Sequence, residues 1–126
     1  MKICFDIDGV LCNQVAGDYE TAEPNGEMID LLNRRYAQGD TILLHTSRYM
    51  GRANGNADEA ERIGRALTEK QLAQWGVRYH ELIMGKPRYD LVIDDRSIFF
   101  DANPAKIESL LKRETEQDHK VEAALR

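Results

Sequence analysis

The apolar residues of this chain follow two patterns, short continuous runs and longer stretches with helical spacing. Continuous runs are typical of strands buried in a parallel sheet, and we expect them at 2–7, 41–45, 77–83 and 91–93. Apolar residues three and four positions apart predict helices at 26–38, at 56–75 and from 104 onward. Strands that alternate with helices predict an α/β fold, a three-layer Rossmann-like parallel sheet with helices on both faces.

Capping and stop residues set the expected limits of these helices. Asn56 is suited to be the N-cap of the second helix, and Gly39 and Gly76 follow the first two helices as stops. Asn103 and Pro104 form an N-cap and first-turn pair for the last helix. On the second helix we expect a buried stripe of Ile63, Leu67, Leu72 and Trp75.

Three segments lack a regular pattern. Residues 9–25 contain several turn formers, and 48–55 form a polar, glycine-containing loop. Residues 112–126 carry four bases, four acids and few apolar side chains, so we expect a frayed or partner-seeking helical tail. The predicted organisation is one domain over 1–111 and a C-terminal tail over 112–126.

Charge and composition exclude several classes of protein. The 126 residues have a net charge of −5, which argues against a general polyanion binder. Residues 1–30 alone hold one base and seven acids, so the acidity needs a local explanation. No apolar run approaches the roughly 20 residues of a membrane span, and early acids argue against a secretory signal. We therefore expect a cytoplasmic protein in which Cys4 and Cys12 are reduced thiols, a disulfide between them being the alternative.

Polar side chains follow the predicted strands at the points where the strands end. Asp6 and Asp8 are two residues apart, so an extended chain would project both carboxylates to one face. Ligands of open parallel sheets bind beyond the carboxyl ends of the strands. Each polar residue alone has a simpler interpretation as a turn former, a cap or a solvated charge, but the set is more specific. In chain order the set is Asp6, Asp8, Thr46, Ser47, Arg48, Lys86, Asp94 and Asp95.

A high density of carboxylates at one sheet edge predicts a divalent cation. Carboxylate oxygens suit the hard ion Mg²⁺, which keeps several waters and bridges to substrate phosphate. The three histidines are scattered along the chain, so a Cys/His zinc site is not indicated.

This order of residues resembles the haloacid dehalogenase (HAD) superfamily of phosphohydrolases, over residues 1 to about 111. Its four motifs correspond to Phe5-Asp6-Ile7-Asp8-Gly9-Val10, Leu43-Leu44-His45-Thr46-Ser47, Lys86 and Val92-Ile93-Asp94-Asp95. The run from Gly85-Lys86-Pro87 to Asp94-Asp95-Arg96-Ser97 in a short chain is similar to the small subfamily III members, which include phosphatases of capsule and surface-polysaccharide loci. It also looks like the phosphatase domain of polynucleotide kinase-phosphatases.

The resemblance implies a Mg²⁺-dependent phosphomonoester hydrolase with an aspartyl-phosphate intermediate. Asp6 would be the nucleophile, and Asp8 would protonate the leaving alcohol and later deprotonate the attacking water. Thr46 and Lys86 would hold the phosphoryl oxygens. An acid at position 8 favours a phosphatase over a dehalogenase, because halide release needs no protonation.

The resemblance also implies binding roles. Mg²⁺ would be bound by the Asp6 carboxylate, the Asp8 backbone carbonyl and Asp94, with Asp95 as a further ligand or orienting a metal-bound water. Ser47 and the Arg48 guanidinium are expected to bind substrate.

The spacing of the motifs leaves no room for a cap domain, so the resemblance implies a capless core with residues 9–25 as a small flap. Such a site would need a large substrate or a neighbouring subunit to exclude water, so a homo-oligomer is an open alternative. Acids in the flap at Asp18, Glu20 and Glu23 would repel a polyanion and suit hydroxyl groups. We therefore expect a sugar phosphate as the substrate, and neither a membrane nor a nucleic acid as a partner.

Other functions remain to be weighed against this one. One alternative is a 3′-phosphatase that acts on nucleic-acid ends or nucleotides, and another is a catalytically idle HAD-fold binding protein. A receiver domain of two-component signalling is excluded by residue order, because Asp94 and Asp95 come after Lys86.

Overall fold

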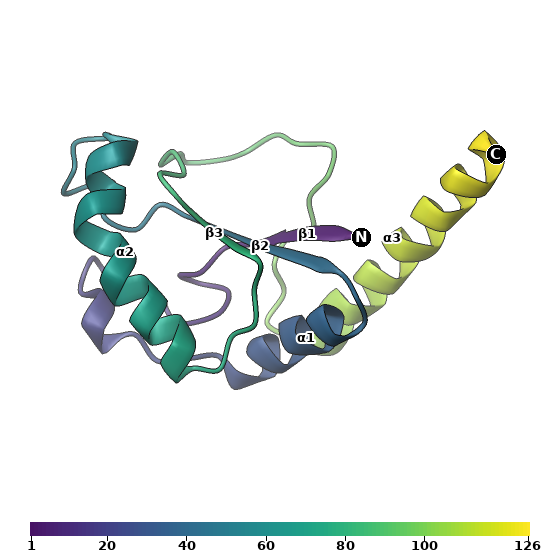
Figure 1. Ribbon diagram of the computed structural model, residues 1–126, viewed down its shortest axis with the longest axis horizontal. Helices are drawn as coiled ribbons and strands as arrows, with labels where there is room; N and C mark the ends of the chain where they lie inside the picture. The colour runs from purple at the N-terminus through teal and green to yellow at the C-terminus, as the bar shows by residue number, and fades with distance from the viewer. The chain divides into compact units, whose positions relative to one another are not determined.

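A computed structural model describes all 126 residues and shows an α/β chain (Figure 1). In chain order the elements are β1 (Lys2–Phe5), a 3-10 turn η1 (Tyr19–Thr21), α1 (Gly26–Ala37), β2 (Thr41–Thr46), α2 (Ala57–Gln74), β3 (Glu81–Met84) and α3 (Pro104–Leu125). The chain divides into two compact units. We call Lys2–Val92 the core unit, and Met1 together with Ile93–Arg126 the C-terminal unit.

The core unit is built on three parallel strands in the order β1-β2-β3. In this register Phe5 lies opposite Leu44, which lies opposite Leu82, so three large apolar side chains share one face. That face is buried, whereas alternate residues of β2 such as Leu43 and His45 are only half-buried. The hydrophobic core therefore lies on one side of the sheet.

Helices α1 and α2 supply the layer that covers this core. Helix α1 contacts β2 and α2 contacts β3, and Figure 1 shows both helices beside the sheet. Both crossovers advance in the same direction along the sheet, so right-handed connections place the two helices on one face. The core unit thus confirms a parallel α/β arrangement, and its own helices form one layer rather than the expected two.

Local capping explains where the helices begin. Side chains of Asn25, Asn56 and Asn103 each accept a hydrogen bond from a backbone N–H in the first turn of α1, α2 and α3. Pro104 follows as the first residue of α3. The predicted caps at Asn56 and Asn103 are therefore confirmed, and the predicted limits of α1 and α2 hold to within one residue.

The predicted buried stripe of α2 is wrong in part. Ile63 is exposed, and Leu67 and Trp75 are only half-buried. The helix instead buries a stripe of mostly small and polar residues, because Tyr49 packs closely against its Gly64. The buried residues of α2 are Ala60, Gly64, Thr68, Gln71 and Leu72.

Strand limits differ more than helix limits from the predictions. β1 ends at Phe5 rather than at residue 7, and β3 begins at Glu81 rather than at 77. The expected fourth strand at 91–93 does not form, and Leu91 and Ile93 are 86% and 102% exposed. A continuous apolar run predicts burial, but a strand also needs a neighbouring backbone to pair with, and three residues gain few hydrogen bonds to offset their ordering entropy.

The C-terminal unit is dominated by α3. This helix runs without a break from Pro104 to Leu125, so the expected tail at 112–126 is helical and continues α3. The division between the two compact units falls at 92/93, and residues 111 and 112, where the tail was expected to begin, both lie inside α3. None of the α-helices is both long and apolar enough to span a membrane.

Replacing Gly64 by alanine should destabilise the core unit. A Cβ at this position would overlap the ring of Tyr49, which is itself buried. Overpacking costs about 1–3 kcal/mol and exceeds the roughly 1 kcal/mol gained in helix propensity. We expect Gly64→Ala to unfold at a lower urea concentration by circular dichroism.

Gly26 provides the matched control, because it begins α1 and a Cβ there would meet no atom within 4 Å. Gly26→Ala should leave the urea midpoint unchanged or raise the free energy of unfolding by about 0.5 kcal/mol. Equal midpoints for the two variants would contradict the close packing of Tyr49 on α2.

Candidate active site

The carboxyl ends of the three strands bring together Asp6, Thr46 and Lys86. Asp6 directly follows β1, Thr46 is the last residue of β2, and Lys86 comes two residues after β3. Lys86 Nζ lies 3.7 Å from Asp6 Oδ2, although β2 separates the strands that carry these residues. The backbone N–H of Lys86 donates to the carbonyl oxygen of Thr46 at 3.0 Å, which holds the lysine across the end of β2.

Asp6 and Lys86 affect each other's ionisation. Burial raises the pKa of Asp6, and the positive charge of Lys86 only partly opposes this effect. Burial alone would lower the pKa of Lys86, but the charge of Asp6 and contact with Tyr89 raise it, so the ammonium stays charged. The pKa of His45, which lies nearby, is lowered by burial and by Lys86. This part of the site therefore places the partly buried Asp6 near a charged lysine and a histidine whose pKa is lowered.

Asp8 is bound by a different cation. Arg48 Nε donates to Asp8 Oδ2 at 2.9 Å, and Arg48 Nη2 donates to Asp8 Oδ1 at 3.0 Å. The Cys12 thiol also donates to Asp8 Oδ1, at 3.4 Å. Burial and the charge of Asp8 raise the pKa of Cys12 to about 12, so the thiol keeps the proton that it donates.

The prediction that Asp6 and Asp8 project together from one extended strand does not describe the site. β1 ends at Phe5, so the alternation of side chains stops before both aspartates. Asp6 pairs with Lys86 after β3, whereas Asp8 pairs with Arg48 after β2. The two carboxylates are therefore neutralised separately.

The side chain of Arg48, which was expected to bind substrate, is completely buried. Its guanidinium donates to Asp8 and to Gln71 Oε1, the latter at 2.6 Å, and lies 4.9 Å from the centre of the Tyr19 ring. Its backbone N–H donates to Thr46 Oγ1 at 3.1 Å. In this structure Arg48 positions Asp8, and the neighbouring Ser47 is half-buried.

Within the core unit, Tyr19 connects residues 9–25, the flap, to α2 and to the loop after β2. Gln71 on α2 accepts from Arg48 and, through Nε2, donates to the carbonyl oxygen of Tyr19. The backbone N–H of Tyr49 donates to the Tyr19 hydroxyl at 3.2 Å. One residue of the flap is thus held by both α2 and the loop that follows β2.

The loop after β2 makes a second connection to the flap. Arg52 Nη2 donates to the carbonyl oxygen of Gly17 at 2.6 Å, and its guanidinium lies 5.0 Å from the centre of the Tyr49 ring. Tyr49 has a φ of 67°, a left-handed conformation that bulky residues rarely adopt. Such strain persists only where surrounding contacts hold the backbone, as the packing of Tyr49 does here.

Sequence reasoning missed three members of this network, which are Cys12, Tyr19 and Gln71. A signal for Gln71 was present, because it continues the spacing of Ala60, Gly64 and Thr68 along one face of α2. That signal is weak, since a row of small and polar residues resembles a solvated face. No local pattern marks Cys12 or Tyr19.

Asp94 and Asp95 belong to the C-terminal unit, where both side chains are exposed. Asp94 Oδ1 accepts a hydrogen bond from the backbone N–H of Arg96 at 2.8 Å, which is a local turn interaction. Neither unit contains a group of three or more His, Cys, Asp or Glu side chains arranged to hold a metal ion. Among the predicted catalytic residues, the core unit brings the side chains of Asp6 and Lys86 together, and Thr46 reaches Lys86 through its backbone carbonyl while its own side chain is buried.

The chain is similar in structure to a crystal structure described as an MCSG target from Vibrio cholerae. The two share 27% sequence identity with a TM-score of 0.77, over 96% of this chain and 98% of that chain. No family model and no curated protein matches this chain. The likeness supports an α/β fold, and the description of that structure names no activity.

Arg48→Met should destabilise the core unit by about 3 kcal/mol, because it leaves the Asp8 carboxylate and the Gln71 amide without their buried partner. We expect Asp8→Asn and Arg48→Met to be non-additive in a double-mutant cycle measured by urea unfolding.

The matched control is Arg62→Met. Arg62 lies on the exposed face of α2 and pairs with Glu59 at the surface, where an ion pair contributes little. A loss of stability for Arg48→Met no larger than that for Arg62→Met would contradict the importance of the buried ion pair.

Proposed function

We propose that this protein is a Mg²⁺-dependent phosphomonoester hydrolase that works through an aspartyl-phosphate on Asp6, with a sugar phosphate as substrate. The observation that supports this proposal best is the contact of Asp6 with Lys86 beside the end of β2, where Thr46 lies. A turn-forming aspartate needs no lysine from another strand, whereas a nucleophile that attacks a phosphate needs a cation to hold the anionic oxygens.

The reaction would proceed in two displacements. In the first, an Asp6 oxygen attacks phosphorus, the bond from phosphorus to the substrate oxygen breaks, and the alcohol leaves with that electron pair and a proton. In the second, water attacks the aspartyl-phosphate, loses a proton and releases inorganic phosphate, which regenerates Asp6. Lys86 and the Thr46 hydroxyl would hold the non-bridging oxygens in both steps.

Asp8 would deliver and then recover the proton. Its carboxylate accepts hydrogen bonds from Arg48 and from the Cys12 thiol. Arg48 would hold the Asp8 carboxyl group in place for this proton transfer.

The donors in the core unit fit a hard cation. The Asp6 carboxylate and the Asp8 backbone carbonyl both offer oxygen, and the Asp6 side chain is 38% exposed. Mg²⁺ is commonly bound by one or two carboxylates and keeps several waters, so a cluster of three acidic side chains is not required. When bound, Mg²⁺ would neutralise charge on the phosphoryl group. Asp94 and Asp95 are proposed to complete the set on the basis of the resemblance alone.

The arrangement of the core unit also supports a capless enzyme. Between Asp8 and Thr46 the chain forms the flap, α1 and β2, and between Thr46 and Lys86 it forms one loop, α2 and β3. The flap is therefore the segment that would limit the access of water to Asp8.

Asp6→Asn should abolish hydrolysis of p-nitrophenyl phosphate, because an amide cannot act as the nucleophile. The purified variant should unfold at the wild-type temperature or above it, since burial of the Asp6 charge is unfavourable. Steady-state kinetics with Mg²⁺ and thermal unfolding of the same preparation measure both properties.

Asp30→Asn is the control for this substitution, because Asp30 is an exposed aspartate of α1. It should retain wild-type turnover. Wild-type-like activity in Asp6→Asn would disprove the assignment of the nucleophile, and an inactive wild-type protein would favour the idle binding protein.

Removal of divalent cations with EDTA should abolish turnover, and Mg²⁺ should restore it. If Asp94 is a ligand, Asp94→Asn should raise the Mg²⁺ concentration for half-maximal activity by about tenfold or more. Asp101→Asn serves as the control from the same unit, because the Asp101 carboxylate pairs with Lys106 instead. An unchanged Mg²⁺ requirement in Asp94→Asn would remove Asp94 from the proposed ligand set.

A further inference from the structure

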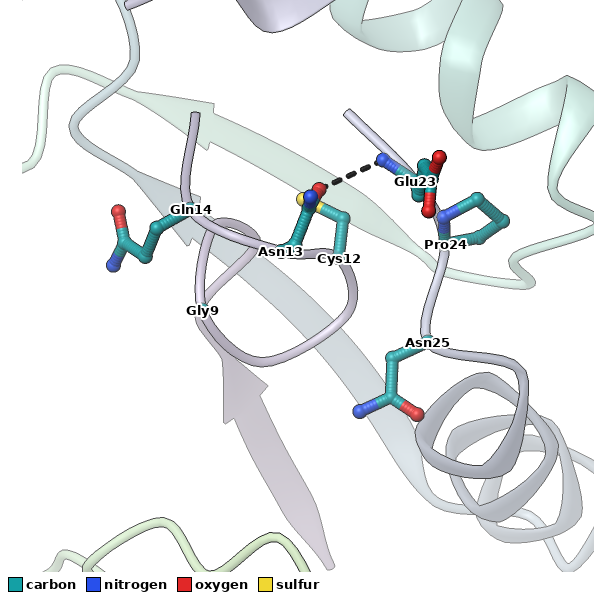
Figure 2. Close-up of a pocket in the computed structure, with 7 residues that line it drawn as sticks. All are labelled: Gly9, Cys12, Asn13, Gln14, Glu23, Pro24 and Asn25. Carbon is teal, nitrogen blue, oxygen red and sulfur yellow. Dashed lines mark hydrogen bonds between the residues drawn. The ribbon is translucent and has the colours of Figure 1, made fainter. Parts of the chain in front are cut away.

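The flap forms an open depression of its own, with a volume of about 440 Å³ (Figure 2). This volume lies within the range of about 300–1,000 Å³ that is usual for small-molecule sites. The lining comes entirely from residues 9–25, so the flap alone forms the wall. The lining residues are Gly9, Cys12, Asn13, Gln14, Glu23, Pro24 and Asn25.

Two of the residues that line this flap pocket connect it to Asp8. Gly9 follows Asp8 in the chain, and Cys12, another lining residue, donates from its thiol to Asp8 Oδ1 at 3.4 Å. Asp8 is the group proposed to protonate the leaving alcohol. A molecule in the flap pocket would therefore lie beside the residue that serves the alcohol part of the substrate.

The polar groups of the pocket suit hydroxyl groups. Three carboxamides and one carboxylate line it, and no lysine or arginine does. Both ends of the Asn25 amide are used, by the backbone of Met28 and of Val10, and Asn13 Oδ1 accepts from the backbone N–H of Glu23. The NH₂ group of Asn13 remains open to a ligand.

Both the NH₂ group and the oxygen of the Gln14 side-chain amide are free to bind a ligand. This side chain makes no hydrogen bond within the structure, and its Nε2 lies so close to Gly9 that a Cβ there would come within 2.8 Å. Gly9 also has a φ of 88°, a conformation that favours glycine. The tight Asp8-Gly9 turn thus makes room for an amide that can both donate to and accept from a hydroxyl.

We infer that the flap pocket binds the uncharged, hydroxyl-rich part of a phosphorylated sugar or polyol, and that Gln14 recognises its hydroxyl groups. The inference rests on the proposed function, because it assigns the alcohol side of that reaction. Amide and carboxylate oxygens accept from hydroxyls, while Glu23 and the lack of any lining cation disfavour the phosphate backbone of a nucleic acid.

The test compares substrates that differ in the hydroxyl groups they offer to the pocket. Wild-type protein and Gln14→Ala are assayed with Mg²⁺ on glucose 6-phosphate, mannose 6-phosphate, N-acetylglucosamine 6-phosphate and p-nitrophenyl phosphate. The nitrophenyl group has no hydroxyl for Gln14 to recognise. For the best sugar phosphate, the ratio of its kcat/KM to that of p-nitrophenyl phosphate should fall about fivefold in Gln14→Ala, which corresponds to the loss of one neutral hydrogen bond.

Gln74→Ala is the matched control, because Gln74 is an exposed glutamine at the end of α2. It should leave the same ratio unchanged. An equal fall for both substrates in Gln14→Ala would show a structural effect and overturn the inference.

A further substrate separates this inference from the proposed function. If the wild-type protein hydrolyses p-nitrophenyl phosphate but prefers a 3′-phosphorylated oligonucleotide to every sugar phosphate, the pocket assignment is wrong and the phosphatase assignment stands. If it hydrolyses none of the phosphate esters with Mg²⁺, the proposed function fails and this inference fails with it.

Discussion

A buried guanidinium must have an opposite charge beside it, and in this protein Asp8 supplies that charge to Arg48. The same guanidinium donates to Gln71 and lies over the ring of Tyr19. The ion pair therefore joins the turn after β1, the loop after β2, helix α2 and the flap. Breaking it would leave uncompensated polar groups on several elements at once, so both Asp8 and the Tyr19 part of the flap are held in part by this ion pair.

The two aspartates at the end of β1 have different surroundings because their partners differ. Asp6 meets Lys86 at the sheet edge, where its side chain stays partly exposed and accessible to a substrate. Asp8 faces the interior, where Arg48 and Cys12 hold it. This separation explains part of the acidity of residues 1–30, since two of its carboxylates are offset by cations from later in the chain. Glu23 has a different place, in the wall of the flap pocket.

Predictions from the sequence were most accurate where the causes are local. Helices α1 and α2 were predicted to within one residue because caps, stops and spacing lie inside each segment. The strand at 91–93 was predicted from apolar residues alone and does not form, since pairing depends on another segment. The same limit applied to Arg48, which was expected to bind substrate and whose burial no nearby residue indicates. Its burial depends on Gln71 and Asp8, which are 23 and 40 residues away.

The sequence by itself determined the α/β class, the helices and the order in which chemical groups follow the strands. From that order alone one could expect Asp6, Thr46 and Lys86 to meet, because parallel strands bring their carboxyl ends to one edge. Only the tertiary structure decided which cation each aspartate meets, and that the flap carries a polar pocket beside Asp8. The physical reason is range: capping and periodicity act within a few residues, whereas ion pairs and packing depend on segments that only folding brings together.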